Sequence, residues 1–194
     1  MRLFIAIDLP DSVKDWLGEI IAELSACRAD VRWVHTDSMH LTLKFLGNVE
    51  AQELAAIDGV LKKIAGTAQP TQGRLRNLGS FPHLCRPRVL WIGVEPIDER
   101  LPALHAGLDG RLAKIGFSKE QRRFHPHISL GRVRGNRRLT ALQEVIENQA
   151  GIKARSFAIE HLTLFESALR RTGPHYTALG TYSFRARQRS RPFE

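Results

Sequence analysis

Two short stretches of this sequence could perform acid–base chemistry. Each is a histidine followed two residues later by a hydroxyl side chain, with apolar residues between and after, and the two are His40-Leu41-Thr42-Leu43 and His127-Ile128-Ser129-Leu130. In a β-strand, residues i and i+2 point to one face and residues i+1 and i+3 to the other. Each stretch should therefore present an imidazole and a hydroxyl on one face and bury its apolar side chains on the opposite face.

Two such faces directed at each other would suit the cleavage of a phosphoester. The reaction needs a base that takes a proton from the attacking oxygen and an acid that supplies one to the leaving oxygen, and histidine can fill either role near neutral pH. The hydroxyls can donate hydrogen bonds to the non-bridging phosphate oxygens as charge develops there. This arrangement requires neither a metal nor a cofactor. One such stretch could be an ordinary strand, but two in matching contexts are more specific.

Two other histidines fit related patterns and need an alternative interpretation. His161-Leu162-Thr163-Leu164 has the same pattern of residue types, but we expect His161 to be a histidine at a strand edge or on the surface. His125 and His127 are two residues apart, a spacing that metal ligands can use. Pro126 lies between them and no cysteine or second histidine–carboxylate cluster is near, so we expect no metal site, and His125 to help shape the site.

The charge of the chain favours a polyanionic partner. It has 29 Lys and Arg against 20 Asp and Glu, a formal net charge of +9, which favours phosphate contacts, although an inert basic surface would have the same composition. One group of arginines flanks the second motif, where the protein would contact a phosphate backbone: Arg122, Arg123, Arg132, Arg134, Arg137 and Arg138. A second group lies near the C-terminus, where a flexible tail is the alternative interpretation: Arg185, Arg187, Arg189 and Arg191.

Hydrophobic periodicity predicts a mixed α+β chain. Strands are expected at 3–7, 31–34, 40–46, 74–78, 88–94, 127–133, 159–165 and 176–184, and helices at 13–24, 54–64, 101–115 and 139–149. The order strand, helix, two strands, helix near the start returns in the second half. This recurrence suggests two similar lobes, and since no long linker separates them, we expect one domain over residues 1–194.

Other features limit where the protein works. Cys27 and Cys85 are too few and too far apart for a disulfide framework or a zinc knuckle, so we expect thiols in a reducing compartment. The apolar opening is interrupted by Asp8 and Pro10 and is too short for a signal sequence. No segment approaches the roughly 20 apolar residues of a membrane span. We therefore expect a cytoplasmic protein that does not enter a membrane.

The two motifs, with their flanking residues, resemble the paired signature of the two-histidine phosphoesterases. The segments are Met39-His40-Leu41-Thr42-Leu43-Lys44-Phe45-Leu46-Gly47 and Phe124-His125-Pro126-His127-Ile128-Ser129-Leu130-Gly131-Arg132. The likeness is greatest to the bacterial and archaeal RNA 2′,3′-cyclic phosphodiesterases, also known as 2′-5′ RNA ligases. It extends from the Phe-Ile-Ala-Ile-Asp opening through Arg86-Pro87-Arg88-Val89-Leu90-Trp91 to Leu164-Phe165-Glu166-Ser167 and Tyr176, which is nearly the whole chain.

The resemblance implies a fold and a division of roles. The fold would be two pseudo-symmetric lobes, each an antiparallel sheet backed by helices, with the histidines facing each other across a central cleft. His40 would be the proton donor and His127 the proton acceptor, while Thr42, Ser129 and Arg132 would hold the phosphate. The family more often has threonine where Ser129 stands; the hydroxyl is kept and only the methyl that restrains its rotamer is lost.

The expected reaction is hydrolysis of RNA 2′,3′-cyclic phosphate ends to 2′-phosphate ends. The alternatives are 2′-5′ ligation at the same site, with a ribose hydroxyl in place of water, and an RNA-end-binding module without catalysis. The expected partner is RNA with cyclic phosphate termini, tRNA fragments among the candidates, bound by a monomeric protein. Phe45, Phe81 and Trp91 could stack a terminal base, although each alone is more often a core residue, and of these we assign Phe45 to substrate binding.

Overall fold

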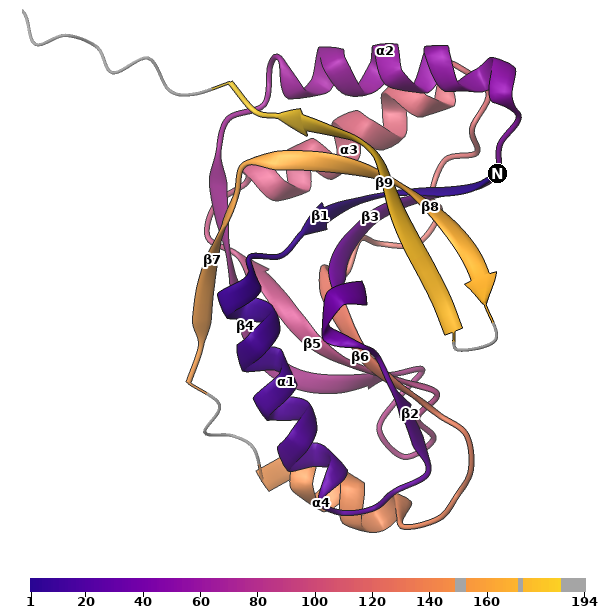
Figure 1. Cartoon of the computed structure of the whole chain (residues 1–194). Helices are drawn as coiled ribbons and strands as arrows, with labels where there is room; N and C mark the ends of the chain where they lie inside the picture. The colour runs from indigo at the N-terminus through magenta and orange to yellow at the C-terminus, as the bar shows by residue number, and fades with distance from the viewer. Residues whose placement is uncertain (149–152, 171–172, 186–194) are drawn as a thin grey trace, which may run out of the picture.

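The computed structural model describes residues 1–148, 153–170 and 173–185 (Figure 1). The strands are β1 (Arg2–Asp8), β2 (Val31–Trp33), β3 (His40–Asn48), β4 (Thr71–Phe81), β5 (Val89–Pro96), β6 (His127–Val133), β7 (Arg155–Ile159), β8 (His161–Arg170) and β9 (Gly173–Ser183). The α-helices are α1 (Asp11–Ser25), α2 (Leu54–Ala65), α3 (Arg100–Ala113) and α4 (Leu139–Asn148), with short 3₁₀ turns at Thr36–Ser38 and Ala51–Glu53.

The strands form one antiparallel sheet that has two lobes. The strand order is β7-β4-β5-β6-β3-β1-β8-β9, and β2 pairs with β6 outside this path. We call β1, β3, β8 and β9 the first lobe and β2, β4, β5, β6 and β7 the second lobe. The lobes meet where β3 lies beside β6, and the backbone pair there is Leu41 with Ile128. The α+β class and the two lobes predicted from the sequence are confirmed, with the two expected sheets joined into one at this pair.

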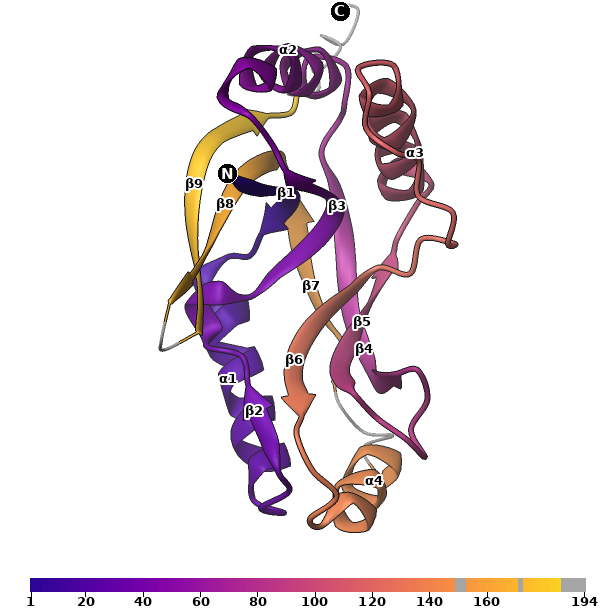
Figure 2. The same ribbon diagram turned by 90° about the vertical axis from the view of Figure 1, so that its right-hand side faces the viewer.

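The helices pack on the face of the sheet that carries the apolar core, which we call the core face. Helix α2 contacts α3 and strands β8 and β9, α3 also contacts β3 and β5, and α1 contacts α4 at the other end of the molecule (Figure 2). Along strand β1, Leu3, Ile5 and Ile7 belong to the core cluster, whereas the alternate Phe4 and Ala6 are also buried but on the other face of the sheet. Full burial of each such aliphatic side chain contributes about 1.5–3 kcal/mol.

A buried ion pair holds β3 against α3. A β-bulge lies in β3 between the partners of Ile5 and Ala6, and beyond it Lys44 points into the interior with only 6% of its side chain exposed. The Lys44 ammonium donates hydrogen bonds to the Asp109 carboxylate of α3 and, at 2.6 Å, to the carbonyl of Ser118. The Asp109 carboxylate also accepts the backbone N–H of Glu120 at 3.1 Å. This network fixes the segment that leads from α3 towards β6.

The structure differs from the sequence prediction mainly near residue 160. The single strand predicted at 159–165 is two strands, β7 and β8, separated by Glu160. Strand β7 is short and only Phe157 and Ile159 are buried, which is too little alternation to detect. Strand β4 is longer than predicted and has a register shift between Arg76 and Leu78, where Asn77 has a φ of 59°. The predicted helix end at residue 149 and the arginines at 187, 189 and 191 lie outside the described residues.

The two halves of the sequence do not each make one lobe. The first lobe combines β1 and β3 from the first half of the chain with β8 and β9 from its end, and the second lobe combines β4 and β5 with β6 and β7. Helix α1 follows a strand of the first lobe but contacts α4, which follows a strand of the second. None of the helices in the described ranges combines the length and apolar character needed to cross a membrane.

Candidate active site

The two motifs lie side by side where the lobes meet. In the antiparallel pair of β3 and β6, Leu41 is opposite Ile128, and both are fully buried on the core face. The same register brings His40 level with Ser129 and Thr42 level with His127, all on the opposite face, which we call the site face. The two histidines are then diagonal neighbours, for which the backbone separation is roughly 7–8 Å. An approximate twofold axis passes between Leu41 and Ile128 and exchanges the motifs.

Both imidazole rings are held in the same way. The Nδ1 atom of His40 lies 2.9 Å from the carbonyl oxygen of Ser38, and that of His127 lies 2.7 Å from the carbonyl oxygen of His125. A carbonyl oxygen only accepts a hydrogen bond, so Nδ1 carries the proton in each ring. The Nε2 atom is then the site of proton exchange, as an acceptor when the ring is neutral and as a donor when it is charged.

His40 is enclosed by aromatic side chains of the first lobe. The ring centre of Phe4 is 4.7 Å away, that of Tyr176 is 5.2 Å away in an edge-on arrangement, and that of Phe165 is 6.1 Å away. Burial lowers the pKa of His40, because an apolar surrounding disfavours the charged ring. The Ser38 carbonyl and the nearby Asp8 carboxylate oppose this shift, whereas the positive charges of Lys14 and a protonated His127 add to it.

His127 has a corresponding enclosure in the second lobe. The ring of Phe81 is 4.9 Å away and edge-on, and that of Trp91 is 6.3 Å away. Burial lowers the pKa of His127 as well, opposed by the His125 carbonyl and assisted by the charge of the His125 ring. The two histidines therefore share a backbone tether and an apolar surrounding, but not the same neighbours.

The aromatic residues considered for base stacking differ in how accessible they are. Trp91 is opposite Gly79 in the β4–β5 pair, and a side chain at Gly79 would collide with the indole. The Trp91 Nε1 atom is buried and without a hydrogen-bond partner among the described residues, and its ring meets that of His125 at 4.8 Å. Trp91 is opposite Ser129 on the site face and is half-buried beside the second motif. Phe45, in contrast, is 68% exposed and lies 6.0 Å from Phe4.

The polar candidates lie around the same pair of strands. Thr42 and Ser129 are partly exposed, each level with the histidine of the other motif. Arg132 is exposed on β6, where its backbone is opposite Arg32 of β2 and Val89 of β5. Its positive charge lowers the pKa of the Tyr176 hydroxyl, which belongs to the first lobe. The guanidinium of Arg132 therefore lies near both lobes.

The other histidines and arginines take different positions. His161 is the first residue of β8, two strands from β3, and among the described residues its ring contacts neither motif histidine. His125 contacts Phe81, Trp91 and His127, in agreement with a role in shaping the site. The arginines that flank the second motif, Arg122, Arg123, Arg134, Arg137 and Arg138, are exposed or partly exposed.

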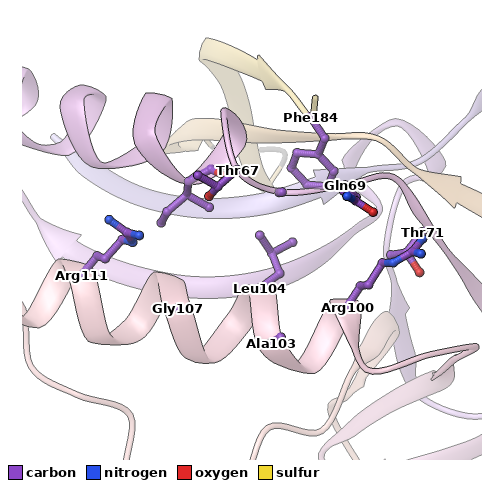
Figure 3. Close-up of a pocket in the computed structure, with 11 residues that line it drawn as sticks. Thr67, Gln69, Thr71, Arg100, Ala103, Leu104, Gly107, Arg111 and Phe184 are labelled. Carbon is purple, nitrogen blue, oxygen red and sulfur yellow. The ribbon is translucent and has the colours of Figure 1, made fainter. Parts of the chain in front are cut away.

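A cavity of about 340 Å³ lies away from the motifs, between α2 and α3 (Figure 3). Its floor is apolar, with Leu104 and Phe184, and its rim includes Arg100 and Arg111. The Arg100 guanidinium already donates to the carbonyl of Pro70 at 2.8 Å. The described residues that line the cavity include no pair of groups that could act as acid and base. In the described part of the chain there is also no cluster of three or more histidine, cysteine or carboxylate side chains that could hold a metal ion.

The sequence does not show which residues enclose His40. Phe4, Asp8 and Tyr176 belong to segments that carry the family resemblance, but nothing in their local pattern assigns them to this enclosure. The alternation of β1 was visible in the sequence, but which of its faces meets His40 depends on the pairing of β1 with both β3 and β8. A pairing between distant segments leaves no local signal.

Comparison with known proteins gives consistent matches. A family model described as LigT like Phosphoesterase matches the chain twice, over residues 7–91 and 92–176. The RNA 2′,3′-cyclic phosphodiesterase of Methanothermobacter thermautotrophicus is 32% identical over 182 residues, covering 94% of this chain and 98% of that protein. The crystal structure of TT0787 of Thermus thermophilus has a TM-score of 0.81 at 27% identity, covering 96% and 100% of the two chains. Escherichia coli LigT, solved in complex with 3′-AMP, has a TM-score of 0.75 at 28% identity, covering 94% and 97%.

Proposed function

Because this chain belongs to the LigT-like phosphoesterase family, we propose that it hydrolyses RNA 2′,3′-cyclic phosphate ends to 2′-phosphate ends. One observation carries the proposal: two histidines on adjacent strands share the site face, and each has its Nδ1 atom bonded to a backbone carbonyl, which leaves Nε2 as the atom that exchanges protons. A base and an acid on the two sides of one phosphorus atom are what the reaction needs. The names of the relatives support the substrate.

The proposed mechanism uses His127 as base and His40 as acid. The Nε2 atom of neutral His127 takes a proton from a water molecule, whose oxygen attacks the phosphorus atom in line with the 3′ oxygen. The bond between phosphorus and the 3′ oxygen breaks, and the Nε2–H of protonated His40 supplies the proton that this oxygen needs. The product carries a 2′-phosphate and a free 3′-hydroxyl. Transfer of a proton from His127 back to His40 through solvent completes the cycle.

The negative charge on the phosphate needs donors that are already in place. We assign this role to the hydroxyls of Thr42 and Ser129 and to the guanidinium of Arg132. Donors that are positioned before the reaction stabilise the transition state without reorganising, and a strand backbone is a rigid support for both hydroxyls. Exposed Phe45, at the edge of the aromatic group around His40, is the candidate to contact the terminal base.

Three further elements of the proposal concern the setting of the reaction. We propose that the physiological substrates include tRNA fragments and that the protein acts as a monomer. The protein works in the cytoplasm, where both free cysteines, Cys27 and Cys85, would stay reduced.

Ligation that forms a 2′-5′ linkage uses the same groups, with a ribose hydroxyl in place of water, and binding without catalysis is the remaining alternative.

The test is to incubate the purified protein, in excess EDTA, with an oligoribonucleotide that ends in a 2′,3′-cyclic phosphate. We expect turnover to a 2′-phosphate, identified by ³¹P NMR, and no loss of rate on chelation, because the proposed acid, base and donors are side chains. His161→Ala should keep the rate. A rate that is lost in EDTA and restored by zinc or magnesium contradicts the metal-free mechanism, a 3′-phosphate product contradicts the regiochemistry, and binding without turnover favours the RNA-binding module.

A further inference from the structure

The site face of the first lobe extends beyond His40 towards the start of β1. Phe4 lies on this face, as its ring contacts with His40 and Tyr176 show. Side chains alternate along a strand, and Leu3 and Ile5 are in the core, so Arg2 lies on the site face with Phe4. The Arg2 side chain is exposed.

The sheet register brings Arg2 level with Tyr176. Strand β1 pairs with β8 up to Leu3 opposite Glu166, and the next position in this register is Arg2 opposite Ser167. Ser167 is in turn opposite Tyr176 of β9. Arg2 and Tyr176 thus belong to one row across three strands, on one face. The Tyr176 ring bridges this row and the catalytic region, since it is edge-on to His40 at 5.2 Å and to Phe4 at 5.0 Å.

Among the described residues, this row carries the positive charge of Arg2 and no carboxylate paired with it. No carboxylate of the described residues forms an ion pair with Arg2. Burial raises the pKa of the Tyr176 hydroxyl, against the opposing positive charges of Arg132 and Arg2, so the hydroxyl is a hydrogen-bond donor at neutral pH. A guanidinium and a phenol on one face, beside an aromatic wall, form a surface with the donors and the charge to bind a phosphate group.

The chemistry indicates on which lobe the RNA chain lies. In an in-line displacement, the attacking and leaving oxygens are on opposite sides of the phosphorus atom. The leaving 3′ oxygen belongs to the terminal ribose, and through that ribose the rest of the RNA is attached. The RNA must therefore be on the side of the acid, whereas the water is on the side of the base. With His40 as the acid, this is the side of the first lobe.

We propose that the RNA chain crosses the site face of the first lobe, and that Arg2 and Tyr176 bind the phosphate that joins the terminal nucleoside to its 5′ neighbour. This inference rests on the proposed function and on its assignment of His40 as acid. It identifies the substrate class as oligonucleotide ends: a nucleoside 2′,3′-cyclic phosphate lacks the second phosphate and cannot use Arg2. The arginines around the second motif, other than Arg132, are then on the water side.

The experiment compares a dinucleotide with a mononucleoside, both ending in 2′,3′-cyclic phosphate, as substrates of wild type, Arg2→Gln and Tyr176→Phe. The matched control is Arg88→Gln, which removes an exposed arginine just before β5 of the second lobe. We expect Arg2→Gln to raise the KM of the dinucleotide about tenfold with kcat unchanged, and to leave the mononucleoside unaffected. The slope of log affinity against log salt should fall by about 0.7. Tyr176→Phe should also raise the KM of the dinucleotide. Arg88→Gln should change the KM of neither substrate.

A parallel binding measurement separates this inference from the proposed function. The same variants are titrated with mono- and dinucleotides that end in a 2′-phosphate, which are not turned over. If the wild type hydrolyses neither cyclic substrate, the proposed function fails, and the binding ratio still tests the role of Arg2. An equal effect of Arg2→Gln on both lengths, or none on either, overturns the inference. A length-dependent effect of Arg88→Gln instead would place the RNA on the second lobe.

Discussion

At the scale of single residues, the two motif histidines make the same hydrogen bond to the backbone but have different charged groups nearby. Each Nδ1 is bonded to the carbonyl two residues earlier, and burial lowers the pKa of each. His40 alone has a carboxylate, Asp8, that raises its pKa, whereas the charge of His125 lowers that of His127. Asp8 therefore favours protonation of His40 and the His125 charge disfavours protonation of His127, whereas burial and the Lys14 charge disfavour protonation of His40. The proposed mechanism requires His40 protonated and His127 neutral.

The first prediction separates the roles of the histidines. Replacing either His40 or His127 by Ala should lower turnover on the order of 10²–10⁴-fold, the usual contribution of one positioned acid or base. A substrate with a better 3′ leaving group needs less protonation of that oxygen, so it should rescue His40→Ala more than His127→Ala. Turnover numbers of both variants on both substrates provide the measurement. Rescue of His127→Ala instead would show that acid and base are exchanged.

The second prediction concerns pH. His40 must be protonated, so the rate falls as pH rises through its pKa, and His127 must be neutral, so the rate falls as pH drops through its pKa. Burial lowers both pKa values, so both limbs of kcat/KM for the free enzyme should lie below pH 6.5, and they belong to the coupled pair. Bound phosphate is negative and raises both pKa values. The basic limb of kcat should therefore lie at higher pH than that of kcat/KM, and coincident limbs would contradict this account.

At the scale of elements, the β4–β5 hairpin supports the second motif through one close contact. Gly79 lies beneath the Trp91 indole, and the indole packs against His125, whose carbonyl holds His127. Sequence patterns located both strands but could not show this contact, because it depends on the register of the hairpin and on the bulge at Asn77.

The third prediction tests this support. Gly79→Ala should displace the indole, destabilise the protein by about 1–3 kcal/mol and reduce turnover by up to about 100-fold through misplacement of His127. The control is Gly59→Ala in α2, where a Cβ meets nothing within 4 Å; it should stabilise by about 0.5–1 kcal/mol and keep the rate. Thermal melts and kinetics on the cyclic substrate measure both. Full activity of Gly79→Ala would show that Trp91 does not position the site.

The fourth prediction concerns the ion pair between β3 and α3. Asp109→Ala leaves the Lys44 ammonium buried without its carboxylate and should destabilise by about 3–5 kcal/mol. Glu95→Ala, which breaks the half-exposed pair with Arg76, should cost at most about 1 kcal/mol. Urea unfolding of both variants measures the loss of unfolding free energy in each. Equal losses would mean that the Lys44 ammonium forms hydrogen bonds with other groups in Asp109→Ala. Lys44→Met combined with Asp109→Leu should recover much of the stability.

The fold and the site were predictable from the sequence to different degrees. Periodicity located the strands that carry His40 and His127 and the helices with a regular apolar stripe, such as the one through Leu17, Ile20 and Leu24. The motif spacing and the resemblance identified the candidate residues and the fold class. The enclosure of His40 by Phe4 and Tyr176 depends on the pairing of β1 with β3 and with β8, and β1 and β8 are more than a hundred residues apart. The division of 159–165 into two strands depends on a single residue, Glu160.

At the scale of the whole molecule, the two lobes depend on each other. The first lobe combines strands from both ends of the chain, and one core cluster contains residues of every α-helix and of both lobes. We therefore propose that residues 1–194 form a single two-lobed domain, because a cut anywhere near the middle would leave each half without strands that its lobe needs.

The fifth prediction follows from this interleaving. The intact protein should unfold in one calorimetric transition, with equal calorimetric and van't Hoff enthalpies, and the separate fragments 1–91 and 92–194 should each lack cooperative unfolding. Asp109→Ala should shift the whole transition to lower temperature, although its ion pair involves a strand of the first lobe. Two resolved transitions, or a fragment that melts cooperatively alone, would contradict the single-domain proposal.

The approximate twofold axis between Leu41 and Ile128 has a consequence for ancestry. The family model matches the chain twice in succession, so the chain has the form of a duplicated gene that became fused. Two identical copies would present a substrate with two equivalent histidines, and it could bind in either of two orientations with equal chance. Fusion allows the copies to mutate separately, and the two enclosures now differ: Phe165 and Tyr176 of the second copy lie beside His40, whereas Phe81 and Trp91 of the first copy lie beside His127. Because the two copies have diverged, a site built on a nearly symmetric pair of strands can bind its substrate in one orientation only.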